Sequence, residues 1–186
     1  MDTFSFLTVL FSVIMGLALT EVLQGFRGLM LARKRVTLYW PALAWGALVI
    51  VIVAQAWWGM FAMHTLTHWN FLMYGTVIVQ ITLLYLAAGV AMPDVPDDGP
   101  VDMRRVYYAN HRWFFTLLAL TVAITFAKDY IFGGRIEPLP NFLMLLYYLL
   151  LCVLAALTSK PWFHWALVPL TALGILTNAA LLSFRL

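Results

Sequence analysis

The chain has 186 residues, of which 64% are hydrophobic and 10% are charged, and its formal net charge is +3. Water-soluble domains carry roughly 25% charged residues, so this composition excludes an ordinary soluble protein and predicts a chain that mostly faces lipid or other protein. The eleven Lys and Arg are explained as membrane-topology signals, and no nucleic-acid partner is needed to account for them.

Six apolar segments are long enough to cross a bilayer, which takes about 20 helical residues. In chain order they cover residues 4–26, 39–63, 69–92, 111–132, 141–159 and 162–184. They lack the alternation over segments of about 10 residues that is typical of membrane β-barrels. We therefore expect an all-α polytopic membrane protein, with one transmembrane domain over residues 1–186 and six transmembrane helices in one bundle.

The longest connection, residues 93–110, contains three prolines and Gly99, which break helices. After them, Asp102 is suited to cap a helix, because its carboxylate can accept hydrogen bonds from free backbone N–H groups. We expect a short interfacial helix that leads from Asp102 into the fourth span.

The distribution of Lys and Arg predicts the orientation of the bundle, because cytoplasmic loops are enriched in these residues. Eight of them fall in the first, third and fifth loops: Arg27, Arg33, Lys34, Arg35, Arg104, Arg105, Arg112 and Lys160. Three fall on the opposite side: Lys128, Arg135 and Arg185. We expect a bacterial cytoplasmic (inner) membrane protein with both termini outside.

Small or polar residues recur at every fourth position of the first span: Ser12, Gly16, Thr20, Gln24 and Gly28. Residues four apart share one face of a helix, so this pattern forms a stripe of small volume. In lipid, such stripes let helices pack closely. The alternative interpretation is that the stripe lines a pore or a substrate path.

Several polar residues lie inside the predicted spans, where each must find a hydrogen bond within the fold. An ion or proton path is one interpretation, and its candidate residues are Glu21, Gln24, Gln80, Asn178 and Asp129. Hydrogen bonds between neighbouring helices are the other. For Glu21 we expect a partner from the inner ends of other spans, namely His111, Arg112, Lys160 or His164.

No catalytic constellation is visible, whether nucleophile with base, phosphate loop or carboxylate pair. The single cysteine, Cys152, excludes an internal disulfide and a cysteine-based metal site. His64 and His68 are four apart, but they fall in a turn, and acidic outer residues such as Glu137 are the only candidates for a third ligand. We expect no enzyme activity, no cofactor and no metal.

The chain resembles small uncharacterised multi-pass bacterial inner-membrane proteins. The resemblance rests on the runs GLALTEVLQG, YWPALAW and QAWW and on a fourth span of the form WFF…KD. It covers nearly the whole chain and implies no activity. A six-helix potassium-channel family carries an FSD signature in its first helix, but here the run is Phe11-Ser12-Val13, so no filter residues are carried over.

These features favour two functions over a third, that of a membrane enzyme or cofactor carrier. The first is an accessory or signalling subunit that packs through its helices against itself, as a homo-oligomer, or against another membrane protein. The second is a small oligomeric channel or transporter for protons or cations that uses Glu21. In both, the lipid bilayer is the main partner.

Overall fold

The computed structural model describes residues 3–66, 68–96, 98–133 and 139–183, and the chain is helical as expected. The elements are α1 (Thr3–Leu31), β1 (Val36–Thr37), α2 (Trp40–Met60), the short 3-10 helix η1 (Phe61–Thr65), α3 (Phe71–Ala91), β2 (Val101–Asp102), α4 (Met103–Gly133), α5 (Leu139–Leu157) and α6 (Pro161–Ser183). Among the described residues, five stretches are long and apolar enough to cross a membrane, namely Phe4–Leu31, Trp40–Thr65, Phe71–Ala91, Met103–Gly133 and Leu139–Leu157. That α6 forms a sixth span remains a prediction.

Local capping explains where several helices begin. The side chain of Asn70 accepts a hydrogen bond from the backbone N–H of Met73 (2.8 Å) at the start of α3. The Asp102 carboxylate accepts from the backbone N–H of Arg104 (2.9 Å) at the start of α4, as the sequence predicts. Pro41 sits in the first turn of α2, where its missing N–H costs nothing.

Helix α4 starts at Met103, eight residues before the predicted start of the fourth span. The expected interfacial helix is therefore continuous with the span, because the Asp102 cap begins a helix that nothing interrupts. With 31 residues, α4 is about 46 Å long at 1.5 Å per residue. That exceeds the lipid core of about 30 Å, so its first turns extend beyond the apolar layer.

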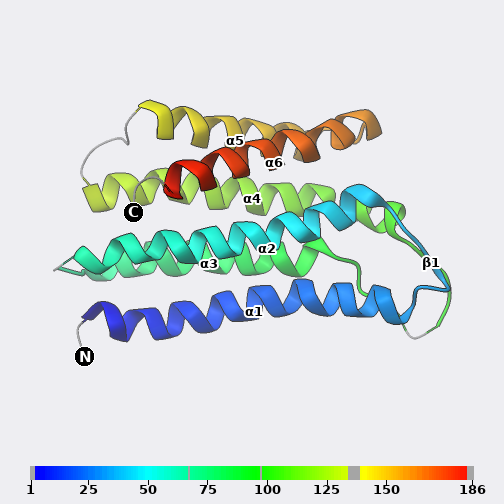
Figure 1. Cartoon of the computed structure of the whole chain (residues 1–186), viewed down its shortest axis with the longest axis horizontal. Coiled ribbons are helices and arrows are strands. Elements are labelled where there is room, and N and C mark those ends of the chain that lie inside the picture. The colour runs from blue at the N-terminus through cyan, green and yellow to red at the C-terminus, as the bar shows by residue number, and fades with distance from the viewer. Residues whose placement is uncertain (1–2, 67, 97, 134–138, 184–186) are drawn as a thin grey trace.

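Successive helices run in opposite directions, and Figure 1 shows both short strands at one end of the bundle. We call this the strand end, and the other, which carries η1 and the last turn of α4, the η1 end. At the strand end β1 pairs in parallel with β2, with Val36 opposite Val101. The Arg35 guanidinium also donates to the carbonyl oxygens of Pro96 (2.6 Å) and Gly99 (2.8 Å). The first and third loops therefore meet, as the predicted topology requires.

Two of the three charges predicted for the other side, Arg135 and Arg185, lie outside the described residues. The third, Lys128, lies near the η1 end of α4, within two turns of Gly133. Which end faces the cytoplasm remains a prediction.

Helix α1 lies at one edge of the bundle, as Figure 1 shows, and packs mainly on α3. Its buried residues follow a helical spacing: Phe11, Met15, Ala18 and Val22. The stripe predicted for packing lies on another face, where Ser12, Gly16, Thr20 and Gln24 are exposed, and only Gly28 adjoins another part of the chain, at Val95. A packing role for the stripe therefore remains a prediction about a contact outside this chain.

The close approach between α1 and the end of α3 is made at Gly25. A β-carbon at this position would overlap the β-carbon of Met92, which follows α3. Met92 is itself buried, and its sulfur lies 2.6 Å from where a β-carbon of Gly46 would be. A larger residue at Gly25 or Gly46 would therefore clash with Met92, which occupies the volume that its side chain would need.

We predict that Gly25→Ala destabilises the protein by about 1–3 kcal/mol, the usual cost of overpacking a close contact. Gly16→Ala is the matched control, because no atom lies within 4 Å of an added β-carbon there. Both changes gain the same helix propensity. Thermal unfolding in detergent micelles measures the difference, and equal melting temperatures for the two variants would contradict the packing described.

Candidate functional site

Aromatic rings fill the interior of the bundle at the strand end. Trp45 of α2 lies edge-on to Phe114 and Phe115 of α4, with ring centroids 5.4 Å and 5.0 Å apart. All three side chains are at most 3% exposed. Such edge-to-face contacts add to the apolar burial of each ring, so this block closes the strand end of the bundle tightly.

His164, in the first turn of α6, is fully buried beside this block. Its Nε2 lies 2.6 Å from the carbonyl oxygen of Thr158, and its Nδ1 lies 2.8 Å from the hydroxyl of Tyr107 on α4. A carbonyl oxygen only accepts, so Nε2 carries the proton and, in the neutral ring, Nδ1 accepts from the Tyr107 hydroxyl. Both ring nitrogens are thereby satisfied without charge.

His111 of α4 makes a second link to the same turn. Its Nδ1 lies 2.7 Å from the carbonyl oxygen of Tyr108, and its Nε2 lies 3.2 Å from the hydroxyl of Ser159. The two imidazoles are 5.6 Å apart and perpendicular. We call Tyr107, His111, His164 and the turn residues Thr158 and Ser159 the clasp, since they fasten the α5–α6 turn to α4.

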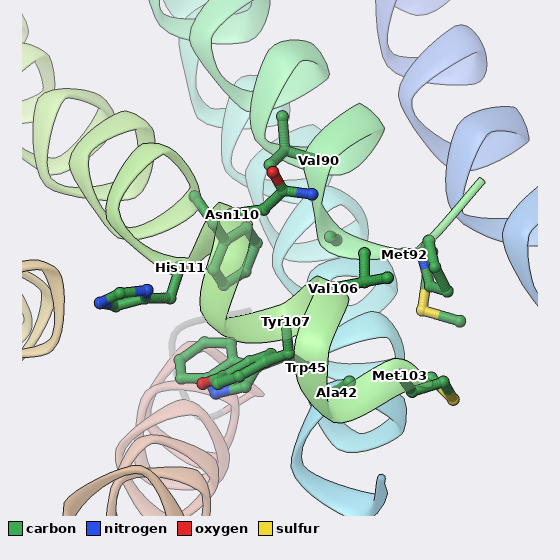
Figure 2. A pocket seen from close by; sticks show the side chains of 12 residues that line it. Ala42, Trp45, Val90, Met92, Met103, Val106, Tyr107, Asn110 and His111 are labelled. Carbon is green, nitrogen blue, oxygen red and sulfur yellow. The ribbon is translucent and has the colours of Figure 1, made fainter. Parts of the chain in front are cut away.

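A small cavity of about 20 Å³ lies next to the clasp. Figure 2 shows Trp45 and Tyr107 at one edge of it and Asn110 and Val90 at another. This volume holds a single water molecule at most. The small cavity is therefore not a ligand site.

A much larger cavity, of about 630 Å³, lies on the other side of Trp45 and extends to the η1 end. Helices α2, α3, α4, α5 and α6 and the short helix η1 all line it, whereas α1 does not. Small residues such as Ala56, Gly59 and Thr121 line it, in place of the large rings that fill the strand end. We call it the central cavity, and Trp45 and Phe115 form its floor.

Polar side chains lie in the central cavity well above its floor. Gln80 of α3 donates through Nε2 to the Thr125 hydroxyl (2.8 Å), which in turn donates to the Thr121 carbonyl oxygen (3.0 Å). Gln55 of α2 donates through Nε2 to the carbonyl oxygen of Ile175 on α6 (3.1 Å). We call Gln55, Gln80 and Thr125 the amide belt.

The structure brings together some of the residues predicted for a path and separates others. Gln80, Asn178 and Asp129 all line the central cavity, as does Lys128. Glu21 and Gln24 do not, because α1 lies outside it. Glu21 instead accepts a hydrogen bond from the Tyr85 hydroxyl (3.3 Å) between α1 and α3. Nothing in the sequence indicates that Tyr85 is its partner.

Sequence reasoning missed the pairing of His111 and His164. More than fifty residues separate them in the chain. Both lie at the inner ends of predicted spans, and this shared level is the one sign in the sequence that they could meet. Gln55 is recognisable in the sequence as an amide within a predicted span. The structure is needed to show that Gln55 and Gln80 line the same cavity.

No protein-family model, curated protein or solved structure matches this chain. The function is therefore argued from the central cavity and the clasp alone.

We predict that Tyr107→Phe lowers stability by about 1–3 kcal/mol, because it leaves the buried Nδ1 of His164 without a donor. Tyr147→Phe is the control, since the Tyr147 hydroxyl donates to the Leu170 carbonyl oxygen (3.1 Å) in an exposed position, and its loss should matter less. Thermal unfolding in micelles compares the two.

A double-mutant cycle isolates the hydrogen bond itself. Tyr107→Phe combined with His164→Leu should cost less than the sum of the single changes, by about 0.5–3 kcal/mol, because either change alone already breaks the bond. Strict additivity would argue against the clasp as described.

Proposed function

We propose that this protein is an integral membrane carrier that binds a small molecule in the central cavity and moves it across the bilayer. The observation that carries the proposal is a cavity of about 630 Å³ that reaches one end of the bundle and is closed at the other. Ligand sites commonly measure about 300–1,000 Å³ and combine apolar walls with a few polar groups.

The closed end favours a carrier over an open channel. The rings of Trp45, Phe115 and His164 are buried side by side at the strand end and leave no space for a continuous pore. Carriers expose a central site to each side in turn by moving helices. In this proposal the clasp is the contact that must open, since it joins α6 to α4 across the closed end.

A path for protons or cations through Glu21 has less support, because Glu21 lies between α1 and α3 and outside the central cavity. The same argument applies to Gln24, which is exposed on α1. The absence of enzyme activity remains a prediction.

We predict that water reaches the central cavity from the η1 end. In a Cys152→Ala background, which is free of cysteine, Ala56→Cys should react with a membrane-impermeant thiol reagent added on that side. Ala54→Cys is the matched control, because Ala54 is exposed on the outside of α2 and does not line the cavity. A thiol surrounded by lipid ionises poorly and should react slowly.

Opening of the clasp distinguishes a carrier from a static receptor. Adding Tyr107→Phe should make Ala56→Cys reactive from the strand end as well. Labelling from one side only, with and without this change, would contradict transport and leave a receptor. Equal labelling of Ala54→Cys and Ala56→Cys would contradict the cavity.

The exposed face of α1 favours a second function, that of an accessory subunit. Ser12, Gly16 and Thr20 are exposed there, and the Thr20 hydroxyl is bonded to the Gly16 carbonyl oxygen of its own helix (2.9 Å). Such a face is suited to close packing against another helix in lipid.

We predict that Gly16→Leu reduces self-association or co-purification of a membrane partner, because it fills the middle of the stripe. Gly75→Leu is the control, since Gly75 of α3 also has no atom within 4 Å of an added β-carbon. Cross-linking in membranes before extraction measures the effect, and identical cross-linking of both variants would count against the accessory function.

A further inference from the structure

The central cavity is mostly apolar at its deep end, and its two glutamines lie at one level above it. Ten residues separate Phe115 from Thr125 on α4, and ten separate Trp45 from Gln55 on α2. At 1.5 Å per residue, both intervals are about 15 Å. The amide belt thus lies about 15 Å above the aromatic floor on both helices.

No charged side chain of the described part of the chain lines the cavity between these two levels. The walls there are mostly apolar, with Leu84, Leu118, Leu151 and Leu167 among them, and their hydroxyls include those of Thr121 and Thr171. The charged lining residues are Lys128 and Asp129, about one turn nearer the η1 end than Thr125. Burying an ionised group in such a compartment is strongly unfavourable, so the deep end suits an uncharged, apolar body.

The shape of the cavity favours an elongated occupant. The lining runs along α2 from Trp45 to Met60, about 22 Å at 1.5 Å per residue. The volume of about 630 Å³ is spread over that length, so the cavity is elongated along the bundle. An extended molecule such as a single chain suits a space of this length.

The amide belt supplies the hydrogen-bonding groups nearest to the apolar deep end. Each glutamine uses its Nε2 as a donor: Gln55 to the Ile175 carbonyl oxygen, which only accepts, and Gln80 to the Thr125 hydroxyl, whose proton is given to Thr121. The orientation of both amides follows from these partners. Their Oε1 atoms accept no hydrogen bond within the described residues, so the belt offers acceptors to the cavity, and each Nε2 keeps a second N–H.

We propose that the central cavity binds an uncharged, single-chain amphipathic molecule with a hydroxyl head. Its apolar body lies on Trp45 and Phe115, and its hydroxyl donates to Oε1 of Gln55 or Gln80. An ionised carboxylate head is rejected, because its burial between largely apolar walls is strongly unfavourable. This assignment rests on the proposed function, since it names the ligand class of the same cavity.

Brominated probes test the assignment directly, because bromine quenches a nearby indole. In lipid nanodiscs at pH 8, 11-bromoundecan-1-ol should quench tryptophan fluorescence with a saturable component, since its bromine reaches the floor beside Trp45. Trp45→Phe should abolish that component and leave only the linear quenching caused by probe dissolved in lipid. The short probe 3-bromopropan-1-ol should give no saturable component.

Head-group selectivity is measured with 11-bromoundecanoic acid, which is ionised at this pH. It should bind at least about tenfold more weakly than the alcohol, because an ionised carboxylate loses its hydration between largely apolar walls. Gln80→Leu should weaken the alcohol about 3- to 10-fold, the value of one neutral hydrogen bond. Gln24→Leu makes the same chemical change on α1, outside the cavity, and should leave the affinity unchanged.

Equal binding of the acid and the alcohol by the native protein would overturn the head-group assignment without any variant having to fold. Saturable quenching that persists in Trp45→Phe would overturn the position of the chain. If Ala56→Cys is labelled but no saturable quenching occurs, the ligand class is wrong and the water-filled cavity stands. If Ala56→Cys is not labelled, the proposed function fails as well.

Discussion

The hydrogen bonds of His111 and His164 determine how this bundle is closed. In lipid, helices are held together by packing and by hydrogen bonds between them, because apolar contact with a neighbouring helix gains little over contact with lipid. Both imidazoles are buried, and each links α4 to the turn between α5 and α6. The last two helices are thereby fixed to the rest of the bundle at the strand end.

The central cavity follows from the distribution of side-chain volume along the same helices. Near the clasp the interior positions hold Trp45, Phe114 and Phe115, which pack ring against ring. Two to four turns further on, the facing positions of α2 and α4 hold Ala56, Gly59 and Thr121. The helices are continuous across this change, so smaller side chains leave space between them instead of drawing them together.

Hydrophobic length and local caps were readable from the sequence, because both are properties of consecutive residues. The starts of α2, α5 and α6 were predicted to within two residues, and Asp102 caps α4 as expected. The rotation of each helix about its own axis could not be predicted from the sequence, since it depends on contacts with helices far away in the chain. For that reason the sequence could not show that Gln80, Asn178 and Asp129 line one cavity while Glu21 lies outside it.

The separation of Glu21 from the cavity has a consequence for how function is distributed over the fold. Helix α1 uses one face on α3, where Tyr85 satisfies Glu21, and leaves its small-residue stripe on another face. The cavity belongs to α2 through α6 and does not reach α1. A partner helix seated on the stripe would therefore leave the walls of the cavity untouched. Association through α1 and binding between the other helices are physically independent, so each can be present without the other.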